Sequence, residues 1–220
     1  MSQYQAYFVP WGTDPTGKSC SVTPCVQGCK LLPERVPVAG PHGALGVTHP
    51  RQRCIEKCKA AAKNFIEWFD EQMRQGKPDY GNLPACPCKL PTEERLCYNP
   101  WPWPEHISVF VAPKGWYIAP PALYPTYLQR LHPGAYIDLR SNQVPRTQCT
   151  YDRRGELITT GPGIGTVDET SIVGGHYGID VRPVEWIITL EGGKLKGGCW
   201  FNMYKRMRPL INRNKCPRNP

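Results

Sequence analysis

Apolar positions recur with a helical period over residues 51–75, a stretch that contains no glycine or proline. They follow one another at steps of three, four and seven residues, as on one face of an α-helix: Ile55, Ala62, Ile66, Phe69 and Met73. Thr48 suits an N-cap and Pro50 a first helical turn. Gly76 and Pro78 mark the other end. We therefore predict a helix over residues 51–75.

Further along the chain, polar and apolar residues alternate in short runs, which is typical of half-buried strands. Residues 107–111 and 116–118 are predicted as strands. Residues 147–152 and 156–160 form a predicted hairpin, whose turn contains Gly155.

Proline is frequent, with 25 residues in a chain of 220. The proline-rich stretches 10–50 and 78–125 cannot carry long helices or central strands. We expect an α+β, disulfide-stapled, loop-rich fold, in which an N-terminal helical part packs on a small antiparallel β-sheet of residues 84–190. Residues 1–80 and 81–220 are predicted as its two parts, unless they form one continuous domain.

Eleven cysteines are spread along the whole chain, which favours a disulfide framework over a single metal-binding knuckle. The odd count leaves one thiol free or paired with another chain. The candidates for disulfides are Cys25, Cys29, Cys54, Cys58, Cys86, Cys88, Cys97, Cys149, Cys199 and Cys216.

Cys54 and Cys58 lie on one face of the predicted helix and repeat the spacing of Cys25 and Cys29. Two parallel bridges between the helix and the preceding segment are the favoured interpretation, and a four-thiolate zinc site is the alternative. Near the C-terminus, a Cys199–Cys216 bridge is predicted. It would close a loop of about 17 residues and contribute around 3 kcal/mol.

The first 19 residues lack the basic and apolar regions of a signal peptide, and the sequence has no apolar run of the ~18 residues that a membrane span needs. We expect a protein that is secreted or delivered to an oxidising compartment, either after removal of a leader or by a route without one, such as a contractile injection system. No cofactor motif stands out.

The formal charge of +9 would suit anionic partners such as cell envelopes, but solubility is the favoured interpretation of it. Nucleic-acid binding through the basic segment 194–218 is a lesser alternative. Trp101 and Trp103 suggest either a ligand platform or tryptophan packing on proline, and the second interpretation is favoured.

The order of four motifs resembles the AMOP domain, a cysteine-rich extracellular module of mucin-type and other adhesion-associated proteins. The motifs are Cys86-Pro87-Cys88, His132-Pro133-Gly134-Ala135, Arg140-Ser141 and the run from Gln148-Cys149 through Tyr151-Asp152 to Gly155-Glu156-Leu157-Ile158. The resemblance covers about residues 84–165 and implies extracellular adhesion or interaction without catalytic residues. The chain departs from the family at Ile137-Asp138 and at Thr150, where the family typically has cysteines.

The segment from Gly161 to Pro183 looks similar to C-terminal regions of bacterial secreted toxins and specialised-secretion effectors. It contains His176 four residues before Asp180, among glycines, with Asp168 upstream. A histidine oriented by a carboxylate is the minimum unit for hydrolysis, so these three residues are the predicted catalytic site. A metal site on the same residues lacks a supporting motif, and a structural histidine is the plain alternative.

Two other motifs are interpreted as structural. The run Gly161-Pro162-Gly163-Ile164-Gly165 lacks the lysine of a phosphate loop and is predicted to be a glycine-dense turn. His132 is predicted to be a turn residue.

For function, we expect a secreted antibacterial or anti-host effector that acts on the cell envelope, possessing a cognate immunity protein or delivery apparatus as partner. A non-catalytic extracellular adhesion or ligand-binding module is the alternative.

Overall fold

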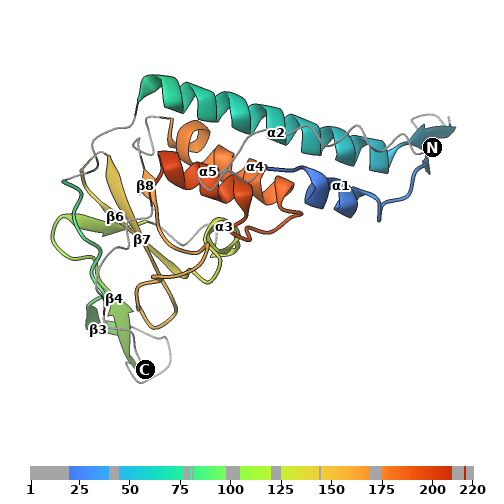
Figure 1. Cartoon of the computed structure of the whole chain (residues 1–220). Coiled ribbons are helices and arrows are strands. Elements are labelled where there is room, and N and C mark those ends of the chain that lie inside the picture. The colour runs from blue at the N-terminus through green and yellow to red at the C-terminus, as the bar shows by residue number, and fades with distance from the viewer. Residues whose placement is uncertain are drawn as a thin grey trace. The chain divides into compact units, whose positions relative to one another are not determined.

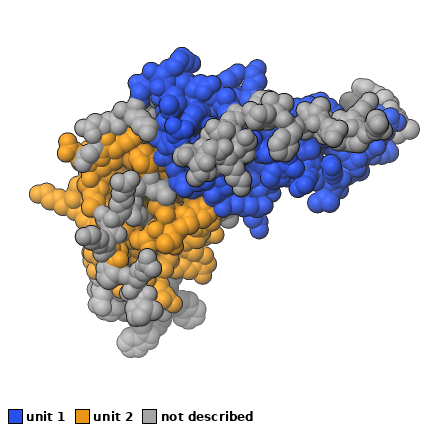
Figure 2. Space-filling view, viewed as in Figure 1, with its two compact units in different colours: residues 1–78, 177–207 blue, residues 79–176, 208–220 orange. Residues whose placement is uncertain are grey.

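The structure is a computed structural model that describes residues 20–39, 45–76, 80, 82–97, 105–119, 125–143, 145–168, 175–209 and 216. The chain divides into two compact units, coloured separately in Figure 2. Unit 1 comprises residues 1–78 and 177–207, and unit 2 comprises residues 79–176 and 208–220. The class is α+β, as predicted, with helices and small antiparallel sheets (Figure 1). Residues 177–207 group with the N-terminal segment, whereas the sequence division had kept them with residues 81–220.

Unit 1 is mainly helical. Its elements are α1 (Thr23–Cys29), β1 (Val36–Ala39), β2 (Leu45–Thr48), α2 (Pro50–Gln75), a π-helix (Tyr177–Val181), α4 (Arg182–Leu190) and α5 (Cys199–Met207). The predicted long helix is confirmed as α2, and Pro50 occupies its first turn. The predicted cap was wrong: the N-cap residue is His49. Thr48 instead ends β2, and its hydroxyl donates to the carbonyl of Val36 at 3.4 Å.

The core of unit 1 is aromatic and lies between α2 and α5. The ring of Phe65 meets the ring of Trp200 edge-on at 5.5 Å, and Trp68 stacks on Tyr204 at 5.7 Å. Such ring pairs add to the free energy that burial of their apolar area supplies. Met73, predicted on this face, is 45% exposed, because the buried stripe runs through Phe65, Phe69 and Gln72 instead.

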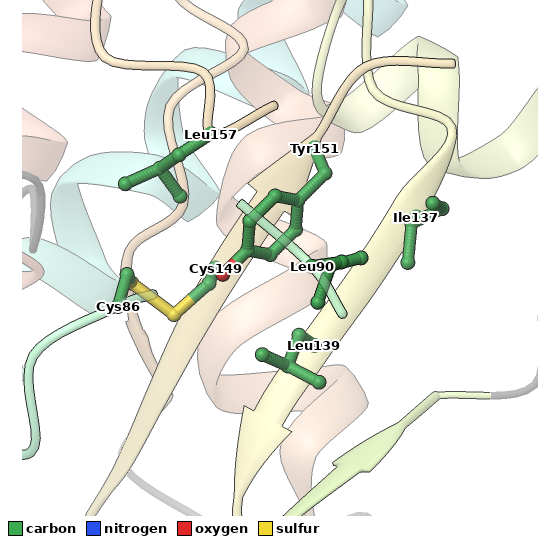
Figure 3. Close-up of a cluster of buried hydrophobic side chains, with 7 residues drawn as sticks. All are labelled: Cys86, Leu90, Ile137, Leu139, Cys149, Tyr151 and Leu157. Carbon is green, nitrogen blue, oxygen red and sulfur yellow. A yellow bond between two sulfur atoms is a disulfide. The ribbon is translucent and has the colours of Figure 1, made fainter. Parts of the chain in front are cut away.

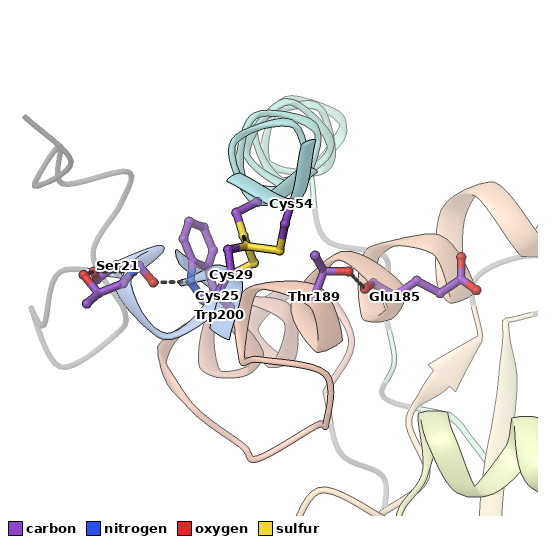
Figure 4. Close-up of a disulfide and its surroundings, with 9 residues drawn as sticks. Ser21, Cys25, Cys29, Cys54, Glu185, Thr189 and Trp200 are labelled. Carbon is purple, nitrogen blue, oxygen red and sulfur yellow. Dashed lines mark hydrogen bonds between the residues drawn. A yellow bond between two sulfur atoms is a disulfide. The ribbon is translucent and has the colours of Figure 1, made fainter. Parts of the chain in front are cut away.

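Three disulfides staple unit 1. Cys25–Cys58 and Cys29–Cys54 tie α1 to α2, which confirms the two parallel bridges predicted from the paired spacing (Figure 4). Cys20–Cys199 joins the segment before α1 to the start of α5, across 179 residues of sequence. Close to this bridge, the indole of Trp200 donates to the carbonyl of Ser21 at 3.1 Å.

Unit 2 consists mainly of antiparallel strands. The strands β3 (Thr92–Cys97) and β4 (Glu105–Phe110) form one pair, and β5 (Trp116–Ile118), β6 (Ile137–Ser141), β7 (Arg146–Tyr151) and β8 (Val167–Asp168) form a sheet in that order. A short helix, α3 (Pro125–Leu131), precedes β6. The strands predicted over 107–111 and 116–118 correspond to β4 and β5.

One face of this sheet carries the apolar core of unit 2, drawn in Figure 3. Its members are Cys86, Leu90, Ile137, Leu139, Cys149, Tyr151 and Leu157. The Cys86–Cys149 bridge lies within this core, and Tyr151 donates its hydroxyl hydrogen to the carbonyl of Pro87 at 2.8 Å. Burial raises the pKa of Tyr151 above its ordinary value. The second bridge of unit 2, Cys88–Cys216, fastens the C-terminal segment.

The predicted Cys199–Cys216 bridge was wrong, because these cysteines pair with Cys20 and Cys88 respectively. Nearness in sequence suggested the pairing, but the two cysteines belong to different units. Cys20 was missing from the predicted candidates. Ten of the eleven cysteines form five bridges, so no cysteine of the same chain is left to pair with Cys97, which ends β3. This number of bridges indicates an oxidising, non-cytosolic environment.

Two local predictions also need correction. The turn at Gly155 exists, with φ of 73°, but residues 156–160 do not form the second strand of a hairpin. They make isolated bridges, Lys89 with Glu156 and Tyr151 with Leu157, while β8 pairs with the opposite end of β7, at Arg146 and Thr147. The predicted sheet also ended too late: residues 177–190 are helical, and in α4 the buried residues Val184, Ile187 and Ile188 follow the three- and four-residue steps of a helix.

Candidate functional site

The candidate site begins with the alternation of residues along β6 and β7. Side chains at successive strand positions point to opposite faces, so Ile137 and Leu139 enter the apolar core while Asp138 and Arg140 lie on the other face. The register pairs Arg140 with Gln148 on β7, which therefore shares that face. All five residues of β6 are buried. Unit 2 thus holds polar side chains on a buried face, where they need partners.

Arg140 is the centre of this polar cluster. Its Nε and Nη2 donate to Oδ2 of Asp138 at 3.0 and 2.7 Å, and its Nη1 lies 2.9 Å from Oδ2 of Asp168 at the end of β8. The amide of Gln148 also donates to Oδ2 of Asp138, at 3.2 Å. Thr166 in turn donates to Oε1 of Gln148 at 3.4 Å. One guanidinium group therefore holds two carboxylates in fixed positions.

The pKa shifts of the pair reflect burial and mutual attraction. For Asp138, burial would raise the pKa, but the charge and hydrogen bonds of Arg140 outweigh it and hold the pKa below its usual range. For Arg140, burial would lower the pKa, and the charges of Asp138 and Asp168 outweigh it and raise it. Both groups are therefore ionised at neutral pH.

His176 completes the cluster. Its Nε2 lies 3.2 Å from Nη1 of Arg140, and its Nδ1 lies 4.0 Å from Oδ2 of Asp168. Because a guanidinium can only donate, Nε2 must accept, and the hydrogen of the neutral ring is on Nδ1, toward Asp168. The side chain of His176 is 12% exposed, against 3% for Asp168.

Of the three predicted catalytic residues, His176 and Asp168 come together in unit 2. Asp180 belongs to unit 1, where it is buried in the π-helix and its backbone carbonyl accepts a hydrogen bond from Tyr204 at 3.2 Å. Within unit 2, the side chains in contact with one another are those of Asp138, Arg140, Asp168 and His176, hereafter the Arg140 cluster. A metal ion at Asp168 and His176 would compete with the guanidinium of Arg140, which already contacts both residues.

His132 lies close enough to this cluster to interact with it electrostatically. Burial lowers its pKa to about 4, an effect that the charge of Asp138 opposes and that of Arg140 reinforces. Its Nδ1 and the Oδ1 of Asp138 are buried atoms without a hydrogen-bond partner among the described residues. The turn assignment also holds, because the carbonyl of His132 accepts from the backbone of Ala135 at 3.0 Å.

The glycine-rich run is a tight turn against the sheet. A Cβ on Gly163 would overlap the carbonyl oxygen of Pro133, and one on Gly165 would overlap that of Gln148. Glycine is needed there so that two backbones can approach closely. This packing accounts for the motif without a bound phosphate.

Neither the alternative zinc site nor the tryptophan platform adds a functional site among the described residues. Cys25, Cys29 and Cys58 lie close enough to bind a metal ion, but all three are oxidised in bridges, which leaves no thiolates for zinc. Trp101 and Trp103 lie outside the described residues.

Unit 1 also contains a pocket of about 280 Å³. It is lined by Ser21, Pro24, Leu190, Glu191, Lys196, Gly198, Cys199 and Trp200. The carboxylate of Glu191 accepts the backbone N–H groups of Lys196 and Gly198, so it shapes the loop after α4.

Comparison with known proteins gives no relative: no family model matches the chain, and no curated protein or solved structure is significantly similar to it. The resemblance to the AMOP domain therefore stays a prediction. Among the described residues, no helix has the length and apolar character to cross a bilayer.

Sequence reasoning missed Asp138, Arg140 and Gln148 as site residues. The alternation that places them on one face was visible in residues 137–141 and 146–151. A polar face normally contacts water, however, and only the structure shows that this one is buried.

Proposed function

We propose that this protein is an effector, delivered to an oxidising compartment, that hydrolyses a component of the cell envelope with His176 as the proton-transferring group. The observation that carries the proposal is the placement of His176 between the guanidinium of Arg140 and the carboxylate of Asp168. Within the Arg140 cluster, His176 has the most exposed side chain.

The carboxylate of Asp168 supports this role, because its Oδ2 is held by Arg140 at 2.9 Å and lies 4.0 Å from Nδ1 of His176. A histidine that gains a proton in a transition state is stabilised by such a fixed carboxylate.

The proposed reaction uses water. A water molecule gives one proton to Nε2 of His176 while its oxygen bonds to the electrophilic centre of the substrate. The bond to the leaving group then breaks, and the imidazolium returns the proton to that group. Arg140 releases Nε2 during this cycle and keeps its contacts with Asp138 and Asp168, which position the ring.

The test compares His176→Gln with His176→Ala in a protein expressed in the bacterial periplasm. Glutamine keeps an oxygen that accepts from Arg140 but cannot transfer a proton at neutral pH. We expect growth arrest by the wild type and none by either variant, with both variants folded. Lysed cells should show a wild-type-dependent release of envelope fragments.

His49→Ala serves as the matched control, because His49 is an exposed histidine at the start of α2 in unit 1. It should arrest growth like the wild type. Undiminished toxicity of His176→Gln would refute proton transfer by this residue. Co-expression of a cognate immunity protein should restore growth of cells that make the wild type.

A non-catalytic adhesion or ligand-binding module is the second candidate. It is favoured by the fact that Arg140 uses its donors on neighbouring side chains, as in a structural cluster. In that case the wild type is not toxic, and His176→Gln retains the same surface binding as the wild type.

A further inference from the structure

Four large aliphatic side chains of unit 1 are exposed at the end of α1 and on the β1–β2 hairpin. Leu31 is 88% exposed, Leu32 39%, Val38 38% and Val47 57%. We call these four residues the apolar tip. Figure 1 shows the hairpin at the N-terminal end of α2.

The apolar tip is a defined structure rather than a loose end. Arg51 in the first turn of α2 donates from Nε to the carbonyl of Leu32 at 3.1 Å, which fixes the segment after α1. The hairpin pairs Pro37 with Val47 and Val38 with Gly46. Val38 also packs on Gly46, since a Cβ added there would lie 3.3 Å from its methyl group.

The register places exposed aliphatic residues on both faces of the hairpin. Val47 shares a face with its partner Pro37, and Val38, the next residue, points the opposite way. Both valines are nevertheless exposed. A protein partner that packs on one face of a two-stranded hairpin would leave the other face in water.

Basic side chains accompany the apolar tip. The segments 30–35 and 49–53 that flank the hairpin contain four basic residues and one acidic residue: Lys30, Arg35, Arg51, Arg53 and Glu34. Of the four cations, Arg51 is half-buried and the others are exposed. An exposed apolar cluster beside cations matches the interface of an anionic bilayer, where aliphatic groups enter the acyl boundary and cations meet phosphates.

We propose that the apolar tip inserts into the interfacial region of an anionic lipid bilayer, with the surrounding basic residues on its headgroups. A bilayer surrounds an inserted hairpin, so it covers Val38 and Val47 at once. Pro37 lacks an N–H and so weakens β1 as a template for strand addition by another chain. The inference concerns unit 1 and does not depend on the proposed chemistry at His176.

The test measures co-sedimentation of the full oxidised protein with vesicles. We expect binding to vesicles that contain phosphatidylglycerol, little binding to pure phosphatidylcholine, and release by salt. Leu31→Glu combined with Val47→Glu should weaken binding at least about tenfold, because each change removes one inserted aliphatic side chain. Arg35→Gln combined with Arg53→Gln should weaken binding to phosphatidylglycerol vesicles, and so bring it closer to the binding to phosphatidylcholine vesicles.

Met73→Glu is the matched apolar control, because Met73 is 45% exposed near the opposite end of α2. Lys114→Gln with Lys194→Gln is the charge control. Neither should change binding, and His176→Gln should bind like the wild type even if it loses toxicity. Mass spectrometry should find five bridges in every variant.

Three results would overturn the inference. One is the absence of binding to phosphatidylglycerol vesicles. Another is binding that survives Leu31→Glu with Val47→Glu in a folded protein. The third is a wild-type dimer in solution that these substitutions dissociate, because the apolar tip would then be a protein interface.

Discussion

Arg140 and Asp138 stand two residues apart on β6, and a single oxygen of the carboxylate accepts two hydrogen bonds from the guanidinium. The side chains are 10% and 8% exposed, so water provides little screening. The pair is positioned by strand alternation alone, since residues two apart point to the same face. Asp168 adds a second carboxylate from β8, so one guanidinium contacts both carboxylates.

Arg140→Met should destabilise the protein by about 3–5 kcal/mol, because two buried carboxylates lose their cation. Unfolding in urea with the bridges intact measures this change in free energy. Adding Asp138→Leu should recover part of the loss, since one unpaired charge is removed. Arg154→Met, at an exposed turn, should change stability by less than about 0.5 kcal/mol. If both substitutions lowered the free energy of unfolding by similar amounts, the buried contacts of Arg140 with Asp138 and Asp168 would not account for its effect.

Acid should destabilise unit 2 through His132. Its pKa is about 4 in the folded protein against 6.5 ordinarily, so the unfolded chain binds the proton more readily. Stability therefore falls as the pH drops from about 6.5 to 4, by up to about 3 kcal/mol. The stabilising effect of the lowered pKa of Asp138 is lost in a separate window, below its ordinary value of 3.8.

The check is a set of urea titrations across this pH range. His132→Gln should flatten the slope between pH 6.5 and 4 relative to the wild type, whatever its stability at neutral pH. His49 is exposed at the N-cap of α2, so His49→Gln should leave the slope of stability against pH unchanged. An equal slope in His132→Gln would show that other groups cause the acid sensitivity.

The sequence predicted those features that depend on local periodicity or matched spacing. The helix α2 followed from apolar residues at steps of three, four and seven, and its bridges to α1 from the repeated CxxxC spacing. The Cys20–Cys199 bridge could not be predicted in this way, because its cysteines are 179 residues apart and nothing local distinguishes them. The grouping of α4 and α5 with the N-terminal segment in unit 1 also depends on contacts between residues far apart in sequence, so local patterns could not predict it.

The candidate site was predicted in part for a similar reason. His176 and Asp168 stand out as polar residues among glycines, so they could be named from sequence. Arg140 looked like one residue of an alternating strand, and its role depends on burial that a single strand does not specify. Asp180 was named from its spacing relative to His176, and it is buried in the π-helix of unit 1.

Gly165→Ala should severely destabilise the protein, because the new methyl group would overlap the carbonyl oxygen of Gln148 in β7. We expect a loss of at least about 3 kcal/mol, since a strand backbone must move. Gly28→Ala is the matched control: it lies inside α1, and an added Cβ meets no atom within 4 Å. It should be neutral or stabilise by up to about 1 kcal/mol. Thermal unfolding of both variants measures the contrast, and a mild effect at Gly165 would refute the close approach.

The two bridges between α1 and α2 should stabilise the protein by nearly equal amounts, even though one is nested in the other. Cys25–Cys58 closes a loop across 33 residues of sequence, and Cys29–Cys54 lies nested within it. Once the outer bridge is formed, the inner one closes a ring of only about ten residues, which in the chain-entropy model is worth about 3 kcal/mol. Replacing one pair with serine should therefore cost about 3 kcal/mol, and replacing both should cost about 6 kcal/mol. Denaturant unfolding of the two single-bridge variants and the double variant measures these steps. Loss of folding on removal of the inner bridge alone would mean that it has an effect on the native packing of α1 beyond closing the chain.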